Sequence, residues 1–264
     1  MSTARDKIRQ KFFPAEVTDV NHVSEHMFTL RTTRPSTFRF ESGEFTMIGL
    51  DTGEEIIQRA YSMTNASYDE ELTFLSIKVE GGAFTSRLRH IGPGDELLIG
   101  RKPTGTLTLD AVAPGRTLYL FSTGTGIAPF MSLIQDPEIY NRYEQVVLNH
   151  TCRFKPDLVY DTYLREGIQE HPLVGEEAAA QLRYYPTLTR DSFERTGRIT
   201  EHIADGRLWQ DLGLPPMDPE HDRAMICGGP SMLQTLTDEL TARGFRAGDR
   251  GEAGDYAIEK AFVA

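Results

Sequence analysis

The pattern of the sequence changes near residues 110–115, and this change constrains the fold more than any other feature of the chain. Short β-prone runs separated by turn-rich pieces come before it, and apolar strands alternating with helical patterns come after it. Runs of short strands are typical of barrels and sandwiches, whereas alternating strands and helices form a parallel sheet with helices on both faces. We therefore predict two domains, residues 1–114 and residues 115–264.

The first domain is predicted to contain five strands and one short helix. Leu75, Ile77 and Val79 occupy alternate positions of the last strand, which is typical of a strand that buries one face. The predicted strands are Ala15–Asn21, Met27–Thr32, Phe45–Asp51, Ile56–Met63 and Leu72–Val79, and the predicted helix is Thr85–Ile91.

The second domain is predicted to repeat a strand and a helix four times, as βαβ units do. The predicted strands are Thr117–Ser122, Gln145–His150, Gln181–Tyr185 and Ala224–Cys227. The helices predicted to follow them are Pro129–Gln135, Leu158–Glu170, Ile199–Asp205 and Pro230–Arg243.

Charge and composition exclude several classes of protein. The 264 residues include 28 Lys and Arg against 39 Asp and Glu, and the net charge of −11 is unfavourable for binding DNA or RNA. The apolar stretches are far shorter than the roughly 20 residues of a membrane span, and Met1–Phe13 has no apolar segment typical of a secretory signal. We therefore expect a soluble, cytoplasmic protein.

Cysteine content limits the redox chemistry. Cys152 and Cys227 are the only two cysteines, too few for a disulfide framework or for an iron–sulfur cluster held by four thiolates. Any redox chemistry must therefore use another cofactor, and no metal site is predicted.

Two glycine loops follow predicted strands of the second domain, at Thr123–Gly126 and at Cys227–Pro230. Glycines let a phosphate approach the backbone closely, and helix N-termini at this edge of a parallel sheet attract anions. One such loop is equally typical of a plain turn between a strand and a helix, but two in one sheet favour a nucleotide site.

Three arginines follow predicted strand ends on the same side of the sheet, namely Arg153, Arg190 and Arg198. Each alone is typical of a solvated surface arginine. Together, with no acidic residue at the matching place, they favour NADP over NAD, because a 2′-phosphate needs cations where a free ribose hydroxyl needs a carboxylate.

The first domain contains two further candidate sites. Arg59–Ser62 closes an apolar strand with an arginine that can neutralise a pyrophosphate, a tyrosine that can stack on a flat ring and a serine that can hydrogen-bond a ring nitrogen. Gly81–Leu88 adds a glycine turn and hydroxyls at a helix start, which suits an anion. Without a ligand, these runs would be an edge strand with alternating polar residues and an ordinary helix N-cap.

Four motifs occur in order along the chain, Arg59–Ser62, Gly82–Ser86, Gly124–Pro129 and Cys227–Pro230. Together they resemble the ferredoxin–NADP reductase family over essentially the whole chain, and the ending Tyr256–Ala264 resembles its bacterial class. This resemblance implies an N-terminal antiparallel β-barrel that holds FAD. It also implies a C-terminal Rossmann-like α/β domain, built on a parallel sheet, that holds NADP(H).

The resemblance also implies roles for residues on the FAD side. Arg59 would face the pyrophosphate, Tyr61 would stack on the isoalloxazine, and Ser62 would lie near flavin N5 as a catalytic residue. Thr85 and Ser86 would cap the pyrophosphate from their helix. The other residues implied to bind FAD are Ala60, Ile77, Lys78 and Phe84.

On the NADP(H) side, the resemblance places Thr123 beside the nicotinamide and Cys227 near the C4 atom that gives up the hydride. Glu259 would correspond to a carboxylate used in proton handling, although a surface charge would look the same in the sequence. The other residues implied to bind NADP(H) are Arg153, Arg190 and Arg198 at the 2′-phosphate and Gly124, Thr125, Gly126 and Gly228 in the glycine loops.

The end of the chain departs from the plant-type relatives, which end in a tyrosine that covers the flavin. Ala261 stands at the matching place and is followed by Phe262–Ala264. An alanine cannot stack, so Ala261 would screen the flavin less. The bacterial resemblance implies that Phe262 stacks on the adenine of FAD, and a buried terminal anchor is the alternative interpretation.

The function implied by the resemblance is an FAD-dependent exchange of a hydride between NADP(H) and flavin N5, and of single electrons with ferredoxin or flavodoxin. The partner would bind transiently to a monomer. One alternative is a free-standing NAD(P)H–flavin reductase, and another is a flavin-carrying electron-transfer subunit that does not turn over nicotinamide. Arg190 and Arg198 favour the reductase, because such a subunit would not need them.

Overall fold

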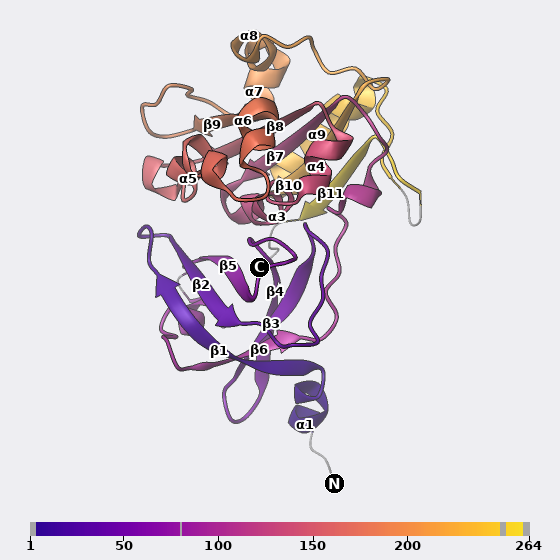
Figure 1. Ribbon diagram of the computed structural model, residues 1–264. Coiled ribbons are helices and arrows are strands. Elements are labelled where there is room, and N and C mark those ends of the chain that lie inside the picture. Colours follow the sequence, from indigo (N-terminus) through magenta and orange to yellow (C-terminus); the bar gives the residue numbers. More distant parts are fainter. Residues whose placement is uncertain (1–3, 80, 249–251, 261–264) are drawn as a thin grey trace.

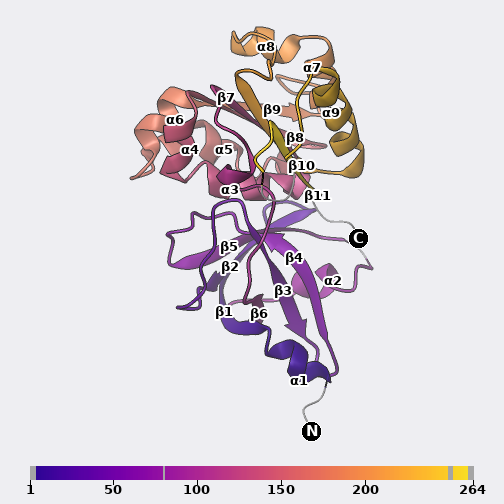
Figure 2. The same ribbon diagram turned by 90° about the vertical axis from the view of Figure 1, so that its right-hand side faces the viewer.

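Residues 4–79, 81–248 and 252–260 are described by the structure, which is a computed structural model. A six-stranded antiparallel sheet from the first half of the chain lies below a five-stranded parallel sheet from the second half (Figure 1). The predicted combination of an antiparallel barrel with a parallel α/β sheet is confirmed. The helix α1 (Ala4–Arg9) lies at the end of the barrel far from the parallel sheet (Figure 2).

The antiparallel strands have the order β4-β3-β6-β1-β2-β5, and a bridge between Met63 and Phe74 brings the two outer strands together. The sheet therefore closes into a barrel. The sequence prediction missed β6, because apolar clusters cover both of its faces and Leu97, Leu98 and Ile99 form a buried run without alternation. The strands are β1 (Phe12–Asn21), β2 (Met27–Thr33), β3 (Phe45–Asp51), β4 (Ile56–Ser62), β5 (Glu71–Ile77) and β6 (Glu96–Gly100), and β5 is followed by the short helix α2 (Thr85–Leu88).

The prediction of one continuous buried face along β5 was wrong. Leu75 is buried, but Ile77 is 37% exposed and Val79, beyond the end of the strand, is 43% exposed. Phe74 belongs to the barrel core, whereas Leu75 packs into a cluster shared with the α/β half. Both faces of β5 are therefore covered up to Leu75, and the apolar side chains after it line a cavity.

The parallel strands have the order β11-β10-β7-β8-β9, and helices cover both faces of the sheet (Figure 2). The predicted alternation of strands and helices is thus confirmed. The strands are β7 (Thr117–Thr123), β8 (Gln145–Cys152), β9 (Leu182–Leu188), β10 (Asp222–Gly228) and β11 (Tyr256–Lys260). The helices are α3 (Ala128–Leu133), α4 (Pro137–Arg142), α5 (Asp161–Arg165), α6 (Gly175–Gln181), α7 (Ile199–Ala204), α8 (Arg207–Leu212) and α9 (Pro230–Ala242).

The helices differ from the prediction in two ways. The predicted helix Leu158–Glu170 is broken into α5 and a short 3-10 helix, because the backbone at Glu166 has φ −129° and leaves the helical region. The prediction also missed α4 and α8, and α8 is bounded by Gly206 and Gly213, both with positive φ. Within the described ranges, no helix combines the length and apolar character needed to cross a membrane.

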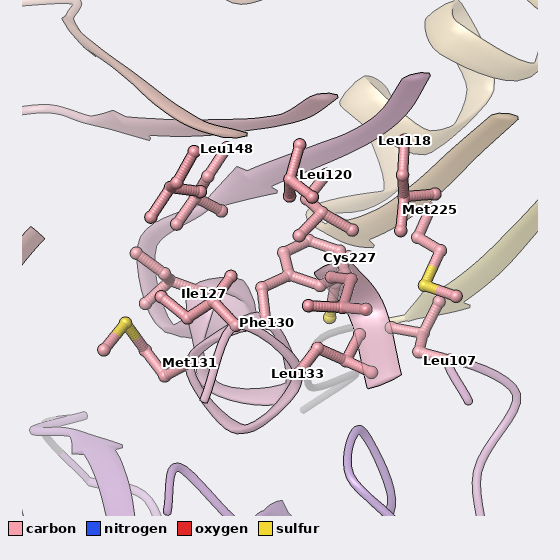
Figure 3. Packing of buried hydrophobic residues seen from close by; sticks show 14 of the residues in the cluster. Leu107, Leu118, Leu120, Ile127, Phe130, Met131, Leu133, Leu148, Met225 and Cys227 are labelled. Carbon is pink, nitrogen blue, oxygen red and sulfur yellow. The ribbon is translucent and has the colours of Figure 1, made fainter. Parts of the chain in front are cut away.

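Alternate residues of β7 point to opposite faces of the parallel sheet. Leu118 and Leu120 pack against α3 in one apolar cluster (Figure 3), whereas Tyr119 packs in a second cluster with residues of α7, α8 and α9. The first cluster also contains Met27 of β2 and Leu75 of β5. The barrel and the α/β half therefore share a hydrophobic core.

Side-chain hydrogen bonds also join the two halves. The hydroxyl of Ser24, in the turn after β1, donates to Asp157 Oδ1 at 3.0 Å. The hydroxyl of Thr106, between β6 and β7, donates to the carbonyl oxygen of Ile258 at 2.8 Å. These contacts fix how the strand ends of the parallel sheet face the barrel.

Candidate active site

A cavity of about 1320 Å³ lies where the barrel meets the parallel sheet. The barrel contributes residues of β4, β5 and α2, and the α/β half contributes residues that follow β7, β8, β9 and β10. The cavity thus lies at the carboxyl ends of the parallel strands, where sheets of this kind bind ligands. The predicted site residues that line it are Arg59, Tyr61, Ile77, Lys78, Phe84, Thr85, Thr123, Gly124, Thr125, Arg153, Arg190 and Arg198.

Other predicted site residues are not part of the cavity lining. The described residues that do not line the cavity are Ala60, Ser62, Ser86, Gly126, Cys227, Gly228 and Glu259. Ala261 and Phe262 lie outside the described residues, so their predicted roles stay predictions.

The two glycine loops lie against each other. A Cβ atom on Gly126 would lie 2.7 Å from the carbonyl carbon of Cys227 and closer still to its oxygen, and a Cβ on Gly228 would overlap the hydroxyl of Thr123. The backbone N–H of Gly229 donates to that hydroxyl at 3.1 Å. Glycine is therefore required at Gly126 and Gly228 by close packing between the loops, and the loops present Thr123 and Gly229 to the cavity.

The three predicted arginines converge on one end of the cavity. Arg153 directly follows β8, Arg190 follows β9, and Arg198 precedes α7. All three are exposed, and the Arg190 guanidinium lies 5.8 Å from the ring centroid of Phe154, which also lines the cavity. Arg198 also forms an exposed ion pair with Glu201, with 3.8 Å between the guanidinium and the carboxylate. These exposed cations suit an anionic ligand at this end.

On the barrel side, Tyr61 and Arg59 point from β4 to the cavity. Tyr61 is 3% exposed, its hydroxyl lies 2.9 Å from the Ser76 hydroxyl, and burial raises the pKa of its phenol to about 12. Its ring also contacts Phe84 in a tilted arrangement with centroids 5.9 Å apart. Tyr61 is therefore fixed in place as a neutral ring, while Arg59 is exposed.

The hydroxyls at the start of α2 bond to the backbone. Thr85 Oγ1 donates to the carbonyl oxygen of Val79 at 3.3 Å, and Ser86 Oγ donates to that of Gly82. The residue that caps the helix is Phe84, without a side-chain hydrogen bond. These bonds shape the turn between β5 and α2 and leave Thr85 on the cavity wall.

Cys227 and Glu259 are neighbours across β10 and β11. Cys227 is 2% exposed, and burial together with the nearby Glu259 carboxylate raises the pKa of its thiol. Burial also raises the pKa of Glu259, whose Oε2 accepts hydrogen bonds from the backbone N–H of Thr106 at 3.1 Å and from its hydroxyl at 3.4 Å. The pair is a neutral thiol beside a carboxyl group that holds its proton more firmly than usual.

We expect Glu259→Gln to stabilise the protein at about pH 8 and to change its stability little at about pH 4. A raised pKa in the folded state means that ionisation costs stability as the pH rises through that value, whereas at low pH the carboxyl is protonated in both states. Glutamine keeps an oxygen that can accept from Thr106. Urea unfolding of the wild type, this variant and the exposed control Glu220→Gln measures the effect. If the stabilities of wild type and Glu259→Gln change in parallel between about pH 4 and about pH 8, the prediction is wrong.

His150 is a residue of this site that the sequence prediction missed. It lies near the end of β8, is fully buried, and its Nε2 donates to the carbonyl oxygen of Gly124 at 2.9 Å. Burial lowers the pKa of its imidazole to about 4, so the ring is neutral at physiological pH. A histidine three residues before Arg153, at the end of an apolar strand, was the signal in the sequence.

The chain is similar to several known proteins. Residues 120–238 match the model of the oxidoreductase NAD-binding domain. Ferredoxin–NADP reductase A of Sorangium cellulosum is 49% identical over 94% of this chain and 89% of its own length, and ferredoxin–NADP reductase of Azotobacter vinelandii is 49% identical over 94% and 96%. A solved ferredoxin NADP⁺ reductase from Neisseria gonorrhoeae with bound FAD and NADP has a TM-score of 0.87 and 29% identity, and covers 96% of this chain and 99% of that one.

An antiparallel barrel and a parallel NAD-binding sheet that line one cavity define a two-domain, nucleotide-dependent oxidoreductase. Identity near one half extends over almost the full length of the relatives from Sorangium and Azotobacter. The chain belongs to the ferredoxin–NADP reductase family.

Proposed function

We propose that this chain is an FAD-dependent ferredoxin/flavodoxin–NADP⁺ reductase. The observation that carries the proposal is the shared cavity, which has glycine loops and three arginines on one side and an apolar strand end with Arg59 on the other. The names of the close relatives and the ligands of the Neisseria structure support it. We further propose that residues 1–114 form the FAD domain and residues 115–264 the NADP(H) domain.

The barrel side of the cavity fits FAD. Ile77 and Val79 expose apolar side chains to it, which suits a flat ring system, and Arg59 supplies a cation for a pyrophosphate. When bound, FAD supplies the chemistry that connects hydride exchange with one-electron transfer. The residues proposed to bind it are Arg59, Ala60, Tyr61, Ser62, Ile77, Lys78, Phe84, Thr85, Ser86 and Phe262.

The α/β side of the cavity fits NADP(H). The glycine loops bring backbone N–H groups to the carboxyl ends of β7 and β10, and the arginines supply charge for a 2′-phosphate. Neutral His150 holds the first loop through the carbonyl of Gly124. The residues proposed to bind NADP(H) are Thr123, Gly124, Thr125, Gly126, Arg153, Arg190, Arg198, Cys227 and Gly228.

We also propose Ser62, Cys227, Glu259 and Ala261 as the catalytic group. No side chain needs to act as a nucleophile in hydride exchange, which agrees with the raised pKa of the Cys227 thiol. The raised pKa of Glu259 suits a group that holds a proton near the reacting atoms.

Ferredoxin or flavodoxin is the electron partner that the names of the relatives indicate. We propose that the partner docks transiently on a cytoplasmic monomer. The net charge of −11 argues against nucleic acid as a ligand. Electron transfer between soluble carriers requires only a small, short-lived interface.

An absorption spectrum followed by anaerobic titration tests this function. We expect the purified protein to show bound oxidised flavin that NADPH bleaches efficiently and NADH bleaches poorly, because the arginine end of the cavity suits a 2′-phosphate. A colourless protein that cannot be reconstituted with FAD would overturn the proposal. A yellow protein that neither nucleotide reduces would instead indicate an electron-transfer subunit.

A further inference from the structure

Four residues with aromatic rings line the cavity within the described part of the chain. Tyr61 and Phe84 belong to the barrel wall, where their rings are buried and contact each other, and His26 belongs to the turn after β1. Among the four, Phe154 is the one that comes from the α/β half, directly after Arg153, and it is half-buried. Phe154 therefore offers a ligand an aromatic surface at the arginine end of the cavity.

Backbone hydrogen bonds hold Phe154 beside two of the cavity arginines. Beyond the ends of β8 and β9, the N–H of Arg190 donates to the carbonyl oxygen of Arg153 at 3.0 Å. The N–H of Lys155 donates to Asp191 Oδ2 at 2.8 Å. The residues on both sides of Phe154 are thus bonded to the segment that carries Arg190. The backbone position of Phe154 does not depend on its own side chain.

The ring of Phe154 contacts both sides of the cavity. The guanidinium carbon of Arg190 lies over it at 5.8 Å from the ring centroid, which is within the range of a cation–π contact. From the barrel, the ring of His26 lies at 6.1 Å between centroids and is tilted by 38°. The hydrogen bond from Ser24 to Asp157 joins the same two segments. These contacts place the ring where the arginine end of the cavity meets the barrel.

The chemistry of NADP(H) puts a flat base next to the 2′-phosphate. The phosphate is attached to C2′ of a ribose, and the adenine is attached to the neighbouring C1′. A phosphate bound by Arg153, Arg190 and Arg198 therefore brings the adenine close to the same residues. A base stacks well on an aromatic side chain, because both present a flat π surface. Phe154 lies between the arginines in the sequence and in contact with one of them, which suits this role.

We propose that Phe154 binds the adenine of NADP(H) by stacking, and so adds affinity for the nucleotide that is independent of the 2′-phosphate. This inference rests on the proposed NADP(H) site and assigns one more contact within it. The arginines then select NADPH over NADH, because only NADPH has the phosphate. Phe154 contributes equally to the binding of both nucleotides, because both contain adenine.

Calorimetric titration of the full-length, flavin-loaded protein with 2′-phospho-AMP tests the stacking without catalysis. We expect Phe154→Leu, which keeps an apolar side chain but removes the ring, to raise Kd about tenfold, the loss of one stack between a base and an aromatic side chain. Phe154→Tyr keeps a flat ring and should keep Kd within about twofold of the wild type. An unchanged Kd in Phe154→Leu, or an equal rise in both variants, would overturn the inference.

The matched control is Phe193→Leu. Phe193 is a half-buried phenylalanine in the segment after β9, and it packs against Cys152, Leu158 and Leu188 without lining the cavity. This variant should bind 2′-phospho-AMP as the wild type does. A rise in Kd equal to that of Phe154→Leu would show that any loss of a ring near these strand ends weakens the site, and would overturn the role of Phe154.

Kinetics with three reduced nucleotides separate stacking from an effect on Arg190. Phe154→Leu should raise KM about tenfold for NADPH and for NADH, and change KM for reduced nicotinamide mononucleotide, which has no adenine, less than about twofold. A rise confined to NADPH would show that the ring only holds the guanidinium of Arg190. A rise with all three would indicate damage to the whole site. Either result would overturn the inference.

Failure of the proposed function would give a different result. If the wild type binds neither 2′-phospho-AMP nor NADPH, the proposed NADP(H) site is wrong, and the inference is overturned with it. If the wild type binds 2′-phospho-AMP and Arg198→Ala weakens that binding while Phe154→Leu does not, the NADP(H) site stands and only the role of Phe154 is overturned.

Discussion

Replacing both Arg190 and Arg198 by alanine is expected to raise KM for NADPH at least about 100-fold and to change KM for NADH less than about twofold. Both side chains are exposed and line the cavity end that also contains Arg153. A 2′-phosphate would lose two charge-assisted contacts, each worth about 1.5–3 kcal/mol, whereas NADH has no phosphate there to lose.

Steady-state kinetics with each nucleotide and one artificial acceptor measure this selectivity. The matched control is Arg183→Ala on β9, which removes an arginine of the same half that does not line the cavity. Equal increases in KM for NADPH and NADH would show that the two arginines support the fold of the site and do not bind the 2′-phosphate.

A methyl group at residue 126 should have the largest effect of any single substitution on the site. We expect Gly126→Ala to destabilise the protein by about 3 kcal/mol and to abolish reduction by NADPH. The new Cβ would meet the carbonyl group of Cys227, which is backbone at the end of a central strand and cannot move aside as a side chain could. The two glycine loops would be forced apart, together with the backbone N–H groups that they present.

Urea unfolding followed by circular dichroism, and flavin bleaching by NADPH, measure these two effects. Gly92→Ala is the matched control, because a Cβ there meets nothing within 4 Å. The control should keep wild-type stability and activity. A Gly126→Ala protein as stable and as active as the control would show that the loops do not pack as closely as the structure has them.

The sequence was sufficient to predict the fold class because hydrophobic patterning differs so clearly between the two halves. The prediction of individual strands failed where burial does not follow an alternation of apolar and polar residues. Leu97–Ile99 is apolar at every position because β6 is covered on both faces, so no period of two remains. Conversely, Ile77 and Val79 follow a strand period but line a cavity, and a periodic pattern cannot tell a cavity wall from a core.

Site residues were predictable where a short stretch of sequence has residue types that suit a ligand at a strand end. The Thr123–Gly126 loop and the arginines after the strand ends needed only their position in βα units, and the structure brings these residues to one cavity. The hydrogen bond from His150 to Gly124 was not predictable, because it joins a side chain to a backbone carbonyl in another element; only the place of His150 at the end of an apolar strand marks it in the sequence. The hydrogen bond between Ser24 and Asp157 was also not predictable, because it joins two residues from different halves of the chain.

The apolar cluster that contains Met27, Leu75 and the first face of β7 has a thermodynamic consequence. Unfolding either half would expose that cluster to water, so neither half gains much by melting before the other. Heating should therefore give one cooperative transition, with calorimetric and van't Hoff enthalpies that agree. A nucleotide that binds only the α/β half would then raise the melting temperature of the barrel as well. Binding to the folded state stabilises the whole unit that unfolds in one transition.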